Sequence, residues 1–290
     1  EFSNQWRSSL VTFARRINAI AKQARANAET LLEALGVPLD HISPDKHVQL
    51  ARLAELCEFV MRFDVVFALQ QGGLARVKAL KECVPLHARL QEQIRDFGHG
   101  LKWNMLDDCD WDQWVQQRND ATGLFGFFKR RSLRQQMCAQ GLEKISDFSI
   151  LEKALAARET LQTLKKSSSE LEGSTIWAGV DSDTDALEST LANGIKAMEL
   201  FKAFISTFDD PAIPLRKLRS VLVEGRDYLT DNTPLVKLSR TVADDAAQLA
   251  ELVEEAAQLQ VTIRQEDDLA TIASDFAVVE QQSERLSRWC

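Results

Sequence analysis

The chain has 290 residues, of which 45% are hydrophobic and 27% charged, and it contains only 12 Gly and 6 Pro. This composition excludes disordered, collagen-like and turn-rich all-β proteins. The formal net charge of -8 belongs to residues 241–290, which hold eleven acids and three bases, so the first 240 residues are balanced and have room for a local basic patch.

No apolar run approaches the roughly 20 residues that a membrane-spanning helix needs, and the first residues lack a secretory signal pattern. We therefore predict a cytoplasmic protein with no membrane partner. The five cysteines form no CxxC pair and have no histidine at metal-ligand spacing, so we expect ordinary, mostly buried thiols in a reducing compartment. Because the sequence opens without Met and Trp6 already lies on a helical stripe, we expect a piece of a longer protein.

The first segment predicts a long helix with a narrow apolar seam. From Trp6 to Leu35, apolar residues are separated by nearly regular steps of four and three, which is the spacing of a coiled-coil seam. The last segment repeats this pattern from Val242, loses phase around residues 260–268 and resumes at Leu269. We interpret the break as a stutter or kink within one long helix.

The residues between these ends also follow helical patterns. Ser43 and Pro44 predict a capped helix start with Pro at the first helical position, and Gly72 and Gly73 predict the end of that helix. No alternating strand pattern bounded by turns occurs. Further helices are predicted to about Phe97, around Trp111 and Trp114, from Lys129 to Gln140, Asp147 to Leu171, Asp183 to Thr207 and Pro211 to Leu229, and from Pro234 onward.

The predicted fold class is therefore all-α. We expect residues 1–35 and 236–290 to pair as a long antiparallel coiled-coil stalk, with residues 36–235 forming a multi-helix bundle head. Seam residues alone do not decide whether the stalk is intramolecular or pairs with a second copy, so self-association through the stalk stays open.

The motifs of common enzyme sites are missing. No Gly is followed by Lys, so there is no GxxxxGK[ST] phosphate loop, and GxGxxG, HExxH and GxSxG are absent as well. The histidines are spread along different segments, which favours exposed or capping roles; they are His41, His47, His87 and His99.

Carboxylates at alternate positions, Asp181, Asp183 and Asp185, begin like a calcium-binding loop. However, Ala186 occupies the position that needs Gly, and Ala192 occupies the position of the bidentate Glu. We therefore favour a role for these acids at the start of the next helix. The sequence predicts no catalytic residue, no metal site and no cofactor in this chain.

The clearest candidate binding site is a basic cluster that directly follows Phe125, Phe127 and Phe128. Its members are Lys129, Arg130, Arg131 and Arg134. Such a cluster can bind phosphates, and exposed aromatic rings beside it can stack on unpaired bases. In the competing interpretation, the phenylalanines fill the core while the bases form a solvated rim or pair with acids of residues 107–112. The shortage of other large core residues favours this second interpretation.

The stretch Ile176 to Leu187 (IWAGVDSDTDAL) resembles a Trp-x-Gly-x-Asp-[ST]-Asp-Trp-x-x-Leu motif. This motif opens a helix in the helical, coiled-coil insertion of large bacterial superfamily 1 helicase-like proteins. Thr184 stands where the family commonly has Trp. The segment from Asp108 to Arg134 is similar to an aromatic segment followed by a basic helix in the same insertion. The resemblance covers residues 1–230, and Trp177, Gly179 and Asp183 match the motif.

The resemblance implies a non-catalytic accessory domain of an ATP-dependent helicase, a hydrolase that often carries a nuclease-like domain. ATP and Mg²⁺ would act in the motor, and the partner would be nucleic acid, with DNA preferred to RNA. Trp177 is expected as an anchor, Gly179 as a turn and Asp183 as a cap. The alternative function is a coiled-coil protein–protein interaction scaffold without nucleic-acid contact. An independent enzyme is disfavoured because the chain has no site pattern.

Overall fold

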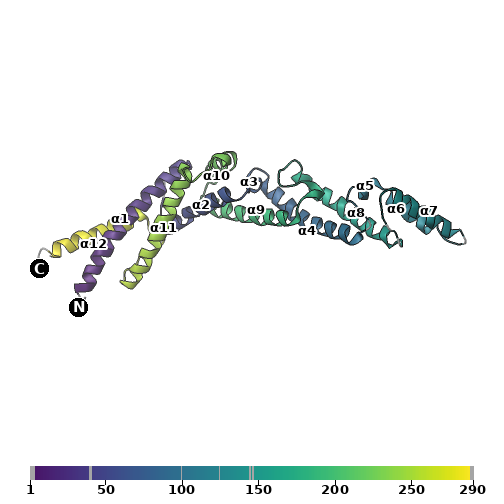
Figure 1. Cartoon of the computed structure of the whole chain (residues 1–290). Helices are drawn as coiled ribbons and strands as arrows, with labels where there is room; N and C mark the ends of the chain where they lie inside the picture. Colours follow the sequence, from purple (N-terminus) through teal and green to yellow (C-terminus); the bar gives the residue numbers. More distant parts are fainter. Residues whose placement is uncertain are drawn as a thin grey trace. The chain divides into compact units, whose positions relative to one another are not determined.

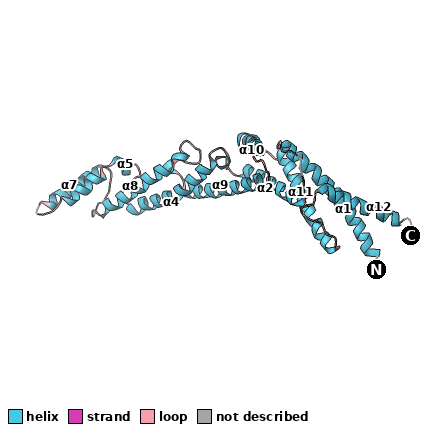
Figure 2. Cartoon of the chain, turned by 180° about the vertical axis from the view of Figure 1, so that it is seen from behind, coloured by secondary structure: helices cyan, strands magenta, loops and turns pink. Residues whose placement is uncertain are grey.

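The computed structural model describes residues 4–38, 41–98, 100–123, 125–143, 145 and 147–287. In these residues the chain forms twelve α-helices and no β-strand, which confirms the all-α prediction (Figure 2). His99 and both extreme ends of the expected stalk lie outside the described residues.

The chain divides into two compact units, which are described separately. Unit 1 contains Glu1–Gln71 and Ile195–Cys290, and unit 2 contains Gly72–Gly194. The division falls inside α9 (Thr184–Ile205) and groups residues 36–71 and 195–235 with the two ends of the chain.

Unit 1 is built on α1, which packs against α11 and α12, while α11 also packs against α2 (Figure 1). Short helical segments and the second half of α9 complete the unit. Its elements are α1 (Asn4–Ala34), α2 (Pro44–Arg62), α3 (Val66–Leu69), α10 (Ala212–Arg219), the π-helical η3 (Ser220–Glu224), the 3-10 helix η4 (Arg226–Tyr228), α11 (Pro234–Gln258) and α12 (Leu269–Ser287).

Ion pairs and a hydrogen bond show how α11 and α12 run relative to α1. Arg16 bonds to Glu255 of α11 (2.7 Å), and Arg15 bonds to Glu280 of α12 (3.0 Å), whereas Arg25, further along α1, pairs with Asp268. Asn27 of α1 bonds to Asp245 of α11 (2.7 Å). Higher residue numbers in α1 thus meet lower ones in both partners, so α11 and α12 both run antiparallel to α1.

Within the described residues, the end segments therefore pack as part of a bundle, and no long coiled-coil stalk is evident there. The buried face of α1 is wider than the predicted seam because Ala14, Ala21 and Leu32 are buried next to the seam positions. A single seam would suit one partner, whereas a broad apolar stripe contacts several helices. The expected antiparallel direction of the end segments is present, but each segment has additional neighbours.

The predicted stutter in the last segment is wrong. α11 ends at Gln258 and α12 begins at Leu269, with a non-helical connection between them in which Gln260 has a positive φ of 59°. Because α11 and α12 run in the same direction along α1, this connection returns along α1 before α12 starts. The loss of seam phase marked the end of one helix and the beginning of another.

Asp268, at the end of this connection, bonds to α1, to the segment before α2 and to the start of α12. One carboxylate oxygen accepts a hydrogen bond from the backbone N–H of Ala270 (2.7 Å) at the start of α12, and the other accepts one from Ile42 N–H (3.1 Å). Arg25 of α1 pairs with the same carboxylate. The backbone N–H of Leu269 also donates to the Ile42 carbonyl (2.9 Å), so three segments meet at this point.

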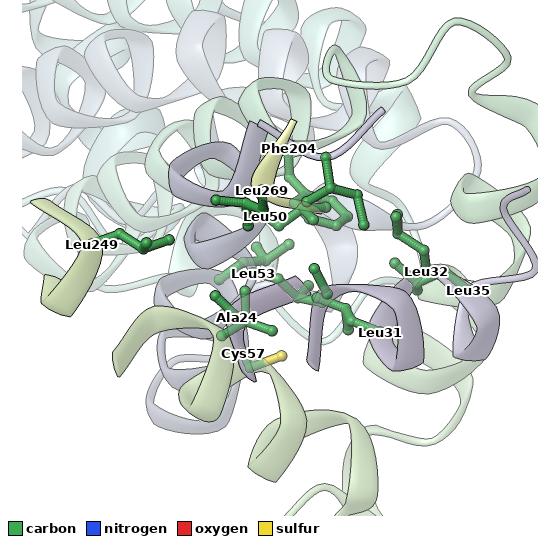
Figure 3. Packing of buried hydrophobic residues seen from close by; sticks show 14 of the residues in the cluster. Ala24, Leu31, Leu32, Leu35, Leu50, Leu53, Cys57, Phe204, Leu249 and Leu269 are labelled. Carbon is green, nitrogen blue, oxygen red and sulfur yellow. The ribbon is translucent and has the colours of Figure 1, made fainter. Parts of the chain in front are cut away.

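The core of unit 1 is apolar and draws on most of its helices (Figure 3). Burying a large aliphatic or aromatic side chain stabilises the folded state by about 1.5–3 kcal/mol. Burial also raises the pKa of the Cys57 thiol to about 12, which keeps it protonated and unreactive. The labelled residues are Ala24, Leu31, Leu32 and Leu35 of the first segment, Leu50, Leu53 and Cys57 of α2, Phe204, Leu249 and Leu269.

Unit 2 centres on the pairing of α4 with α8; α8 also contacts α5 and α6, and α6 contacts α7. Trp111 is fully buried, donates its indole N–H to the Met105 carbonyl (2.9 Å) and packs edge-on against Trp114. The elements are α4 (Gly73–Phe97), α5 (Met105–Asp108), α6 (Trp111–Asn119), α7 (Gly126–Ala139), α8 (Ser149–Ser167), the 3-10 helices η1 (Ser169–Leu171) and η2 (Gly179–Asp181), and the first half of α9.

Most of the described cysteines are buried thiols, as the sequence predicts. Cys57, Cys83 and Cys109 are buried free thiols, Cys138 is an exposed one, and Cys290 lies outside the described residues. None of the described helices is at once long enough and apolar enough to cross a membrane.

Unit 1 contains a buried histidine whose charge opposes folding. His47 is fully buried, and neither ring nitrogen has a hydrogen-bond partner of good geometry. Burial lowers the pKa of His47 from 6.5, although the nearby Asp245 carboxylate and the Val242 backbone favour the charged form. Below pH 6.5 the unfolded chain therefore binds more protons than the folded chain, and stability decreases as the pH falls towards the folded-state pKa.

We predict that the free energy of unfolding falls when the pH is lowered from 6.5 to 5.5, by less than the roughly 1.4 kcal/mol per pH unit that one fully linked proton contributes. Urea titrations at both pH values measure the change. In the His47→Met variant this decrease should disappear. An equal decrease in the variant would show that another group causes it.

Candidate nucleic-acid interface

The basic cluster, Phe127 and Phe128 lie on α7, and Phe125 directly precedes this helix. The first turn of α7 is in unusually close contact with the loop before it. Gly126 opens the helix and is buried; a Cβ atom at this position would lie 2.6 Å from the Ala121 carbonyl oxygen. Its N–H donates to the Gly123 carbonyl (3.0 Å), and Gly123 itself has a φ of +74°. Only glycine allows this approach of the helix start to the preceding loop.

α7 contacts its unit along one narrow face. Gly126, Leu133 and Met137 are its buried residues, and they are spaced by seven and four positions. Residues at that spacing share one side of a helix. The remaining positions of α7 therefore project into solvent.

The three phenylalanines, which we call the aromatic tip, are among the most exposed large apolar residues that the structure describes. Phe125 is 74% exposed, Phe127 70% and Phe128 66%. The interpretation that they fill the core, which the sequence favoured, is wrong. Trp111 and Trp114 occupy the interior near α6, and the contact at Gly126 directs the residues beside it outward.

The four bases of the cluster differ in their surroundings. Lys129 donates to the Asp120 carbonyl (3.2 Å), and the Arg134 guanidinium lies over the Phe148 ring at 5.3 Å from its centroid. Arg130 and Arg131 are exposed and have no hydrogen bond or ion pair with any residue that the structure describes. Lys129 and Arg134 thus have partners within unit 2, whereas Arg130 and Arg131 can bind an anion.

Three of the four acids of residues 107–112, namely Asp107, Asp110 and Asp112, bond to groups other than the basic cluster. Asp107 pairs with Lys165, and Asp112 pairs with Arg158 at 2.7 Å, both on α8. Asp110 caps α6 by accepting the Gln113 N–H (3.0 Å). The predicted alternative in which these acids pair with α7 is therefore not realised for the three aspartates.

The residues of the sequence motif lie around the start of α9. Gly179 has a φ of +72° and begins η2, and the Asp183 carboxylate accepts the Asp185 N–H (2.9 Å), which places it at the start of α9. The Trp177 ring lies edge-on to the His87 ring, with centroids 6.0 Å apart. The motif and the basic cluster thus belong to different helices of unit 2.

His87 has a structural role in this region. Its ring is buried, with one nitrogen 3.0 Å from the Val180 carbonyl oxygen and the other 2.9 Å from the Thr184 hydroxyl oxygen. Gln91 donates to the same Val180 carbonyl (2.8 Å). These bonds use both ring nitrogens, so His87 links α4 to η2 and to the start of α9.

Trp103 is a feature that sequence reasoning missed. Its indole N–H donates to the Asp181 carboxylate (3.1 Å), and these two residues line two neighbouring hollows of about 620 and 350 Å³. No pattern in the sequence could have joined them, because they are 78 positions apart. Within the described part of the chain, no group of three or more potential ligands could hold a metal ion.

Comparison with known protein families, curated proteins and solved structures found no match to this chain. The candidate interface consists of a solvent-facing aromatic tip, two arginines without partners among the described residues, and a close contact at Gly126 that attaches the helix to the preceding loop.

We predict that Gly126→Ala lowers the free energy of unfolding by about 1–3 kcal/mol, because the added methyl group must displace the Ala121 carbonyl. Ser132→Ala, at an exposed position of the same helix, is the control and should be nearly neutral. Chemical denaturation measures both. A stabilised Gly126→Ala variant, as expected from helix propensity alone, would contradict the close contact.

Proposed function

We propose that the chain is a non-catalytic accessory domain that binds nucleic acid through α7 and guides or separates strands for an ATP-dependent superfamily 1 helicase-like protein. The observation that carries the proposal is the exposed aromatic tip beside Arg130 and Arg131, which have no partner among the described residues. Aromatic rings next to uncompensated cations are the elements from which single-strand binding surfaces are made.

The charge distribution supports an anionic partner at this place. Four bases follow the aromatic tip with no acid before Glu143, although the whole chain carries -8. Phosphate contacts supply most of the affinity of sequence-independent binding, and they require a local positive surface whatever the net charge. DNA is the proposed partner in preference to RNA.

The roles of the other parts follow from the resemblance. Trp177, Gly179 and Asp183 shape the start of α9, and in this proposal they have structural roles only. The packed ends of the chain, α1 with α11 and α12, take the place of the stalk that joins the insertion to its motor. ATP and Mg²⁺ belong to the motor, and the hydrolase activity is a property of the parent protein.

The alternative function is a protein–protein interaction scaffold that does not touch nucleic acid. Exposed phenylalanines also suit an apolar groove on a partner protein. Arg130 and Arg131 distinguish the two functions, because binding to nucleic acid has a characteristic dependence on salt, whereas docking of phenylalanines in an apolar groove does not.

We predict that the intact chain binds a single-stranded DNA oligonucleotide and that Arg130→Gln/Arg131→Gln weakens this binding roughly tenfold at low salt. The slope of log K against log salt should become shallower by about 1.4, since each contact to a single strand contributes about 0.7. Fluorescence anisotropy over a salt series measures both quantities.

Lys153→Gln/Lys166→Gln is the matched control, because it removes two exposed charges from α8 of the same unit. This control should retain the affinity and salt slope of the unchanged chain. Equal losses in both variants would indicate unspecific electrostatics. Absence of binding to DNA and RNA at low salt would reject the nucleic-acid function and leave the scaffold.

A further inference from the structure

We infer that the aromatic tip selects strands whose bases are not stacked on one another, and that the chain therefore prefers thymine-rich single strands to adenine-rich strands and to duplex. This inference rests on the proposed function and names its substrate class.

The orientation of the two rings on α7 determines how bases can be bound. The centroids of Phe127 and Phe128 are 5.9 Å apart, and the ring planes are inclined by 79°. A base stacked on either ring lies parallel to that ring. Two bases bound to the two rings are therefore almost perpendicular to each other, and neighbouring bases in that arrangement cannot also stack together.

The ligand must therefore give up its own base stacking when it binds. This cost is small for thymine runs, which are flexible and weakly stacked, and larger for adenine runs. Sequence preferences of single-strand binding surfaces arise from stacking strength and backbone flexibility. In a duplex the base faces are covered by their neighbours, so only the arginines contact it.

The arginines lie next to the rings, where they can contact the phosphates of a bound strand. Arg131 is four positions after Phe127 and three after Phe128, and residues at these spacings are neighbours on a helix surface. Arg130 is three positions after Phe127. Rings and cations thus occur side by side on the outward part of α7, as bases and phosphates do along a strand.

A lipid surface is disfavoured by the same placement. Helices that lie in a membrane interface separate an apolar face from a cationic face. On α7, Arg131 shares its side of the helix with both Phe127 and Phe128, so inserting the rings into lipid would also bury the guanidinium. The observations therefore favour a nucleic-acid strand, and membrane binding becomes an outcome of the test.

The experiment compares a fluorescent 15-nucleotide dT strand, a dA strand of equal length and a 15-base-pair duplex on the intact chain. The dT strand should bind at least fivefold more tightly than dA and tenfold more tightly than the duplex. Phe127→Leu/Phe128→Leu keeps the tip apolar but removes its rings. It should weaken dT binding about 30-fold and leave duplex binding unchanged. Tyr228→Leu, which removes an exposed aromatic ring of unit 1, should change neither.

Failure of this inference can be distinguished from failure of the function. Unchanged dT binding in the leucine variant, with loss in Arg130→Gln/Arg131→Gln, would overturn the selection of unstacked strands and leave nucleic-acid binding intact. Absence of binding to all three nucleic-acid ligands would overturn both proposals.

Vesicles containing 30% phosphatidylserine test membrane binding in the same way. Vesicle binding that the leucine variant retains, without dT binding, would assign the tip to membranes and overturn both proposals.

Discussion

The close approach of Gly126 to the Ala121 carbonyl is the constraint on which the candidate interface depends. It sets the start of α7 against the preceding loop at a distance that excludes a Cβ atom. With this turn fixed, Leu133 and Met137 complete the only buried face of the helix among its described residues. The aromatic tip is exposed as a result, and folding of unit 2 gains little from burial of its rings.

In unit 1, by contrast, the large apolar residues of α1 are all buried or partly buried. Two antiparallel neighbours, α11 and α12, cover α1, and Asp268 connects the start of α12 to Arg25 and to Ile42. Buried polar groups occur here as well, since Asp245 accepts hydrogen bonds from Gln23 (3.0 Å) and Asn27. A paired buried carboxylate fixes the register of α11 against α1. The same region holds His47, whose burial favours the neutral ring.

Sequence reasoning predicted the local features and missed the long-range ones. The helical class, the cap at Ser43, whose hydroxyl accepts the Lys46 N–H (3.2 Å), and the helix start at Asp183 follow from neighbouring residues. An apolar seam indicates that a helix face is buried but not how many helices cover it, so the seam of α1 predicts a stalk where the structure has a bundle. Exposure of the phenylalanines depends on the contact at Gly126, and the Trp103–Asp181 bond joins distant positions. Neither has a signal in the sequence.

The central claim is that nucleic acid is bound by α7 and not by another surface, and photo-cross-linking tests it most directly. A single-stranded oligonucleotide that contains 5-iodouracil forms covalent adducts with aromatic side chains in contact with it, and mass spectrometry identifies the peptide. The account predicts saturable cross-links to Phe125, Phe127 or Phe128, which unlabelled dT strand competes away. Saturable cross-links confined to other aromatic residues, such as Trp103 or Tyr228, would contradict it.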